Sequence, residues 1–172
     1  DLLVNLELKI IVDQIRSLNK STAELEETIG KEGRKPEGHR HLTSIKGIGG
    51  LSGGILLPIV GGIGDFAGEG KLAAYFGIVP RVSDSNEIER SGRITKRGTK
   101  LGRTTLIQRA LIAQRYSPYL KTYYEKMKSR RGTGKAIVAL ARKFLGIIYR
   151  TRKNNRVFED FLNFVLAEEA TA

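Results

Sequence analysis

The chain has 172 residues, 40% of them apolar, which is enough for one domain of ordinary size with a single hydrophobic core. It contains no cysteine, which excludes disulfides, thiolate zinc sites and thiol catalysis, and no apolar run is long enough to span a membrane. The formal net charge of +12 is not needed for folding and indicates a polyanionic partner, with nucleic acid as the first candidate.

The charge is concentrated in particular segments. Residues 1–30 contain three basic and six acidic side chains, for a net charge of −3. Residues 81–103 contain seven basic and three acidic side chains (+4), and residues 121–156 contain twelve basic and one acidic (+11). We expect the last two segments to face phosphates, although the 121–156 segment could equally be the solvated face of two helices.

Residues 2–29 are predicted to form one long helix. The apolar residues that repeat at alternating spacings of four and three are Val4, Leu8, Ile11, Ile15, Leu18, Leu25 and Ile29. This heptad pattern fits either an amphipathic helix packed on its own domain or a coiled coil between chains. In the second case the helix would make the protein a homo-oligomer.

Residues 31–41 contain two glycines and Pro36 and little that is apolar, so they are predicted to be a linker. His39 and His41 lie within it, but no carboxylate cluster or cysteine completes a metal site around them, and we expect no metal in this chain. The predicted organisation is therefore a coiled-coil-like helix (1–30), a linker (31–41) and a compact, mainly α domain (42–168).

Residues 42–57 have apolar side chains at helical spacing on both sides of Gly47-Ile48-Gly49, a pattern that resembles the helix-hairpin-helix motif. Glycines let the backbone turn between two short helices, and the N–H groups that open the second helix can bind a phosphate oxygen without reading a base. We expect Lys46, Gly47, Gly49 and Gly50 to contact DNA in this way. The alternative is a helical turn used only for packing.

The next segments are less regular. Residues 58–70 contain five glycines and are predicted to be a flexible loop, and they lack the Gly-Lys-Ser/Thr ending of a nucleotide-binding loop. A short helix is expected over 71–76, before Gly77. Residues 78–98 have no sustained period and are predicted to be an exposed loop with brief extended pieces at 78–82 and 93–95.

Helical periodicity returns after residue 98. One helix is predicted to end before Pro118, and Ser117-Pro118 is predicted to open a second. A third is expected over about 134–152, followed by a last helical piece at 157–166. The three tyrosines of the second helix, Tyr119, Tyr123 and Tyr124, are expected in the core or in a groove.

Four segments, in this order and at these distances, resemble the C-terminal transposase domain of insertion-sequence family 110/116/902. They are Ser44–Gly49, Leu72–Arg81, Gly92–Gly98 and Ala139–Leu145, and the resemblance covers about two-thirds of the chain. It implies a bacterial, cytoplasmic and nucleoid-associated protein that moves mobile DNA by recombination, guided by an RNA. It also implies a coiled coil and a separate N-terminal nuclease-like domain with four acidic metal ligands, where Mg²⁺ is expected. We see no counterpart of that domain in this sequence.

The resemblance also implies a nucleophilic serine three residues after the tripeptide Pro80-Arg81-Val82, which is Ser85 here; the family usually has Gly at the next position, where this chain has Asn86. A serine that attacks a phosphodiester needs a base, for which Asp84 or Glu87 could serve, and cations that stabilise the transition state. The cations expected to bind DNA are Arg81, Arg90, Arg93, Lys96, Arg97, Arg103, Arg142 and Lys143.

Composition alone leaves other possibilities open. Ser83, Ser85 and Ser91 could simply solubilise a loop whose basic residues bind backbone phosphate. The predicted function is a DNA transposase fragment, inactive without the acidic domain, that cleaves and exchanges strands through Ser85. The alternatives are a non-catalytic helix-hairpin-helix DNA-binding module and a coiled-coil assembly element of a larger nucleoprotein complex.

Overall fold

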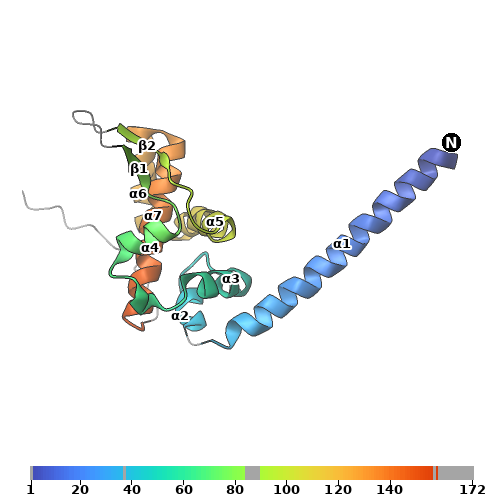
Figure 1. The fold of residues 1–172 in the computed structure, drawn as a ribbon, viewed down its shortest axis with the longest axis horizontal. Helices are drawn as coiled ribbons and strands as arrows, with labels where there is room; N and C mark the ends of the chain where they lie inside the picture. The colour runs from blue at the N-terminus through green and yellow to red at the C-terminus, as the bar shows by residue number, and fades with distance from the viewer. Residues whose placement is uncertain (1, 37, 84–89, 157, 159–172) are drawn as a thin grey trace, which may run out of the picture.

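The computed structural model describes residues 2–36, 38–83, 90–156 and 158. It confirms the mainly α class, with a long N-terminal helix that projects from a compact helical body (Figure 1). The elements in chain order are α1 (Leu2–Arg34), α2 (His39–Thr43), α3 (Gly50–Val60), the 3₁₀ helix η1 (Ile63–Asp65), α4 (Glu69–Tyr75), β1 (Pro80–Ser83), β2 (Arg90–Ile94), α5 (Lys100–Tyr116), α6 (Pro118–Arg131) and α7 (Thr133–Lys153).

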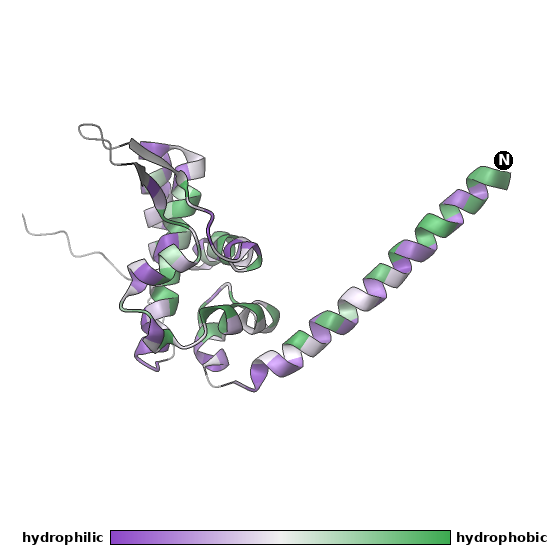
Figure 2. Ribbon diagram, in the orientation of Figure 1, coloured by the Kyte–Doolittle hydropathy of each residue, from purple (hydrophilic) through white to green (hydrophobic). Residues whose placement is uncertain are grey.

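Helix α1 confirms the prediction of a long helix and extends it. Its 33 residues span roughly 50 Å at 1.5 Å per residue. Residues 2–28 are exposed along their whole length, and α1 contacts the body only near its C-terminal end, where Ile29 and Gly33 lie against α3. Apolar and polar residues therefore alternate along an exposed rod, as the green and purple bands of Figure 2 show.

The linker prediction for residues 31–41 was wrong over much of its length. α1 continues to Arg34, because Gly33 is buried against α3 and the helix ends only after this contact. α2 begins at His39, a residue that is only 8% exposed and whose Nε2 lies 3.2 Å from the Gly50 carbonyl oxygen. His39 is thus part of the packed body.

Two helices flank Gly47-Ile48-Gly49, but the first of them, α2, ends at Thr43, so it lies mostly before the predicted range of 42–57 and residues 44–49 form the turn. Gly47 has a φ of +101°, and a Cβ atom there would lie 2.8 Å from the Ala113 backbone nitrogen of α5. Glycine is therefore required at Gly47 both by the left-handed backbone and by the close approach of α5. Leu42, Ile45 and Ile48 of this hairpin are buried in the core.

The prediction of a loop over residues 58–70 was wrong at both ends. α3 continues through Pro58 to Val60, because Pro58 is exposed while Leu57 and Val60 on either side are buried. α4 begins at Glu69, two residues before the predicted start, and η1 lies between the two helices. Only short irregular stretches remain where the glycines predicted a flexible loop.

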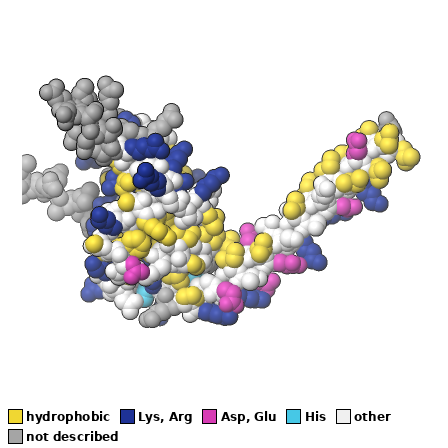
Figure 3. Space-filling model, in the orientation of Figure 1, with side chains coloured by type: hydrophobic (Ala, Val, Ile, Leu, Met, Phe, Trp, Pro, Cys, Tyr) yellow, Lys and Arg dark blue, Asp and Glu magenta, His cyan; other side chains and the backbone are white. Residues whose placement is uncertain are grey.

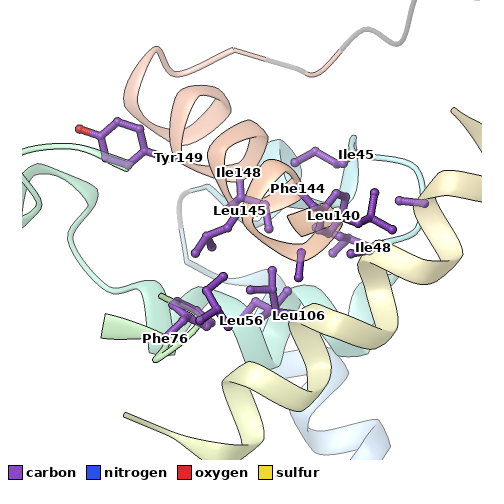
Figure 4. Close-up of a cluster of buried hydrophobic side chains, with 14 of the residues drawn as sticks. Ile45, Ile48, Leu56, Phe76, Leu106, Leu140, Phe144, Leu145, Ile148 and Tyr149 are labelled. Atoms are coloured by element: carbon purple, nitrogen blue, oxygen red, sulfur yellow. The ribbon is translucent and has the colours of Figure 1, made fainter. Parts of the chain in front are cut away.

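Helix α7 lies at the centre of the core. Leu140, Phe144, Leu145 and Ile148 are at most 1% exposed and meet side chains from α3, α4 and α5 (Figure 4). The start of α6 is as predicted, since Ser117 caps it by accepting a hydrogen bond from the Leu120 N–H at 3.2 Å. No helix in the described ranges has both the length and the apolar content of a membrane span.

The segment predicted as a loop with extended pieces forms a β-hairpin. β1 and β2 are antiparallel, with Pro80 opposite Ile94, Val82 opposite Ser91 and Ser83 opposite Arg90. The pairing continues below the strands, where the Thr95 N–H donates to the Val79 carbonyl at 2.9 Å. The hairpin stands at the end of the body formed by the turn between α6 and α7 (Figure 1).

Candidate nucleic-acid interface

A groove of about 940 Å³ runs between the root of the hairpin and the turn that joins α6 to α7. Its walls come from two distant parts of the sequence, one of which is the hairpin and the other the ends of the two helices. The residues that line it are Ile78, Pro80, Ile94, Lys96, Arg130, Arg131, Gly134, Lys135, Val138, Ala139 and Arg142. We refer to this feature as the basic groove.

Five of these lining residues are cations, and none of them is acidic. Lys96, Arg130, Arg131, Lys135 and Arg142 are all exposed. None of the five takes part in the ion pairs found within the described ranges, so their charge is available to a ligand. Lys and Arg side chains gather at this end of the body (Figure 3), an arrangement that attracts a polyanion.

At the root of the hairpin, residues 75–77 and 96–98 pack backbone against backbone. A Cβ atom on Gly77 would overlap the Arg97 carbonyl oxygen, and one on Gly98 would overlap the Tyr75 carbonyl oxygen. Lys96 adopts a left-handed backbone with a φ of 54°, and its N–H donates to the Gly77 carbonyl at 3.0 Å. The position of Lys96 beside the groove is therefore set by the backbone.

Arg103 of α5 makes further hydrogen bonds at this root. Its guanidinium donates from Nη1 to the Lys96 carbonyl at 3.1 Å and to the Phe76 carbonyl at 3.4 Å. The side chain is partly buried between the two ends of the hairpin. The sequence predicted Arg103 as a DNA contact; the structure shows that it joins the end of α4 to the end of β2.

The side chains of the adjacent residues Arg142 and Lys143 have different neighbours. Arg142 is exposed and lines the basic groove. Lys143 is partly buried, and its Nζ lies 5.2 Å from the ring centre of Tyr119 and 5.7 Å from that of Tyr123, both on α6. This cation–π pairing holds α6 against α7, so the two predicted phosphate contacts differ in what they do within the fold.

The remaining predicted residues are placed as follows. Arg81 and Arg97 are exposed near the hairpin root, whereas Arg90 and Arg93 are described only by their backbone in β2. Ser85 lies outside the described residues, as do the candidate bases Asp84 and Glu87. Ser83 and Arg90, the described residues on either side of that segment, are paired across the hairpin.

The helical hairpin lies on another part of the body and presents a second predicted contact. Lys46 and Gly49 are exposed, and Gly50 is partly exposed. Gly49 precedes α3 with an extended backbone (φ −87°, ψ 176°), and a Cβ atom there would meet nothing within 4 Å. Unlike Gly47, Gly49 is not required by the packing of the chain, and its glycine leaves the start of α3 open to a ligand.

Arg130, Arg131 and Lys135 were missed as individual site residues. The only signal for them was the high positive charge of residues 121–156, which could not say which side chains share a surface. They converge because Gly132, with a φ of 78°, ends α6 and lets α7 turn back at once. Over the described ranges, no three His, Asp or Glu side chains gather as metal ligands would.

Comparison with known proteins places these features in a family. Residues 39–125 match the model of the transposase IS116/IS110/IS902 family. The chain is 31% identical over 150 residues to the transposase for insertion sequence element IS1111A of Coxiella burnetii, covering 83% of this chain and 40% of that protein. It is 33% identical over 122 residues to the pilin gene-inverting protein of Moraxella lacunata, covering 69% of this chain and 38% of the relative.

A probable family 20 transposase of Pseudomonas aeruginosa is 28% identical over 146 residues, which are 83% of this chain and 43% of the relative. The chain thus spans less than half the length of these relatives. The matched region contains the helical hairpin, the β-hairpin and the first part of α6, and of the five groove cations it includes Lys96. The chain belongs to the IS116/IS110/IS902 family of transposases.

Proposed function

We propose that this chain binds DNA along the basic groove and supplies Ser85 as the nucleophile for strand cleavage and exchange. The observation that supports the proposal is the position of five exposed cations at the root of the hairpin whose strands lead into residues 84–89. The serine that family spacing selects, Ser85, follows β1 in the sequence, five residues after Pro80 of the groove. The names of the relatives, a transposase and a gene-inverting protein, agree with strand exchange.

The chemistry requires a balanced exchange of bonds at phosphorus. The Ser85 hydroxyl would attack a phosphodiester and form an Oγ–P bond, while the bond from phosphorus to one deoxyribose oxygen breaks. The serine proton passes to a base, and the released deoxyribose oxygen takes up a proton to become a hydroxyl. The phosphoserine ester conserves the bond energy, so that a second strand can be joined by the reverse reaction without ATP.

The groove cations would contribute by stabilising negative charge. The pentavalent transition state gathers charge on the non-bridging oxygens, and preorganised guanidinium and ammonium groups stabilise it without reorganising. Among the groove cations, Lys96 has its backbone held by hydrogen bonds with Gly77 and Arg103. For the whole protein the proposal also includes a guide RNA and a separate Mg²⁺-binding acidic domain, both implied by the family resemblance.

The experiment is to trap the covalent intermediate. The full-length protein would be incubated with DNA that flanks its own coding sequence and resolved on a denaturing gel. We expect a protein–DNA adduct that is lost in Ser85→Ala and kept in Ser83→Ala and Ser91→Ala, with DNA binding unchanged in all three. An adduct that survives in Ser85→Ala, or that is lost in Ser91→Ala, would contradict the assignment of the nucleophile.

A second function, assembly, is favoured by α1. Its seam from Val4 to Leu25 is exposed over the whole length that projects from the body, so packing on its own domain is not what this helix does here. Leu8, Ile15 and Leu18 are each more than half exposed (54%, 52% and 67%). We propose that this seam pairs with the same seam of a second copy and makes the protein a homo-oligomer.

A further inference from the structure

The basic groove has two kinds of surface. Its cations include Arg131, Lys135 and Arg142, which are exposed and come from the end of α6 and the first half of α7. Its lining also includes the apolar side chains of Pro80, Ile94 and Val138, each of which is partly exposed, and we refer to these three as the apolar floor. A surface that bound only backbone phosphates would need the cations, but the apolar floor would add nothing to its affinity.

The floor distinguishes between two forms of DNA. In a duplex the faces of the bases are hidden in the stack, and the outside is a polar backbone that cannot cover apolar side chains. In a single strand the base faces are free and can lie on an apolar surface, while the phosphates track along cations beside it. The combination of cations and an apolar floor therefore matches a single strand.

We propose that the basic groove holds a single strand of DNA, with its phosphates toward Arg131, Lys135 and Arg142 and its bases against Pro80, Ile94 and Val138. This inference rests on the proposed function, because it assigns the form of DNA that the same groove takes. Exchange of one strand at a time passes through such a form, since the cleaved strand leaves one duplex before it joins another. The groove would hold that strand at the root of the hairpin.

Charge alone predicts the opposite preference, which makes the inference testable. A duplex has the higher charge density and releases more counterions per phosphate neutralised, so a purely electrostatic surface binds it more tightly. A preference for the single strand therefore has to come from contacts with the bases. These contacts should be insensitive to salt, unlike those made by the cations.

The test uses the 172-residue chain and one labelled DNA strand of about 12 nucleotides, alone or annealed to its complement, with binding followed by fluorescence anisotropy. We expect the single strand to bind at least about threefold more tightly than the duplex at the same salt concentration. Val138→Ser should weaken single-strand binding about threefold without altering duplex affinity or the salt dependence. An RNA strand of the same sequence should bind no more tightly than the DNA.

The matched control is Leu101→Ser, which removes an apolar side chain that is 59% exposed on α5 and does not line the groove. It should change neither affinity. Duplex binding equal to or tighter than single-strand binding, an unchanged affinity in Val138→Ser, or a preference for RNA would each overturn the inference while leaving DNA binding by the chain intact. Failure to bind either form of DNA would overturn the proposed function as well.

Discussion

Gly33 of α1 and Gly54 of α3 meet backbone against backbone, so close that a Cβ atom on Gly33 would lie 2.5 Å from the Gly54 Cα atom. Beside this contact, a Cβ atom on Gly54 would also lie 2.9 Å from the Ile29 carbonyl oxygen. Two glycines on crossing helices therefore set how α1 joins the body. The direction in which the exposed part of α1 projects depends on this contact.

The first prediction concerns Gly33. Gly33→Leu should lower the free energy of unfolding by about 1–3 kcal/mol, because no space exists for the side chain between the two helices. Gly30→Ala is the control, since a Cβ atom at Gly30 in the same helix meets nothing within 4 Å, and it should stabilise the chain by up to about 1 kcal/mol. Urea unfolding followed by circular dichroism measures both. Similar effects of the two substitutions would contradict the close contact.

The second prediction concerns Gly49 at the start of α3. Gly49→Val should weaken DNA binding severalfold at moderate salt, because its side chain would stand where a phosphate approaches the N–H groups. It should cost at most about 1 kcal/mol of stability, since the space around Gly49 is open and only the helix cap is poorer. Gly49→Ser, which retains a good cap, separates the two effects. Wild-type affinity in Gly49→Val would end the phosphate interpretation of this hairpin.

The third prediction separates Arg142 from Lys143. Each phosphate contact contributes about −0.9 to the slope of log affinity against log salt on duplex DNA, so Arg142→Gln should flatten the slope by about that amount. Lys143→Gln should leave the slope nearly unchanged and instead lower the stability by about 0.5–1 kcal/mol, through loss of the contacts with Tyr119 and Tyr123. Titrations at several salt concentrations distinguish the two. A slope in Arg142→Gln equal to that of the wild type would place Arg142 away from the DNA.

The fourth prediction concerns the exposed seam of α1. Ile15→Glu should convert an oligomer into a smaller species, because a charge in the seam cannot be buried between two helices. Ser17→Glu lies two residues away on another face of the same helix and should leave the oligomer intact. Light scattering at high micromolar concentration measures the mass of each. A monomeric wild type would refute the assembly role of α1.

The helices could be predicted because their patterns are local. The heptad repeat of α1, the Ser117-Pro118 start of α6 and the apolar face of α7 are each readable from a few neighbouring residues. The errors fall where distant contacts override local preference. His39 looked like part of a polar linker, yet it is buried against α3, and Pro58 looked like a helix end, yet the turn around it is fixed by Leu57 and Val60.

The candidate site was predicted less completely than the fold. The positive charge of two segments was evident, but the groove exists only because residues 78–96 and 130–142 come together in space. No pattern in the sequence indicates that Arg142 faces the hairpin while Lys143 turns to the tyrosines of α6. Arg103 was predicted as a phosphate contact because a basic residue in a basic loop gives no hint that backbone carbonyls are its partners.

The interlocked root of the hairpin bears on how such a chain can diverge. Gly77, Gly98 and Arg103 fix the ends of the two strands from below, whatever residues join Ser83 to Arg90. The contacts that hold the Lys96 backbone come from Gly77 and Arg103, both outside the two strands. A hairpin built in this way can vary in sequence along its strands while Lys96 keeps its place beside the groove.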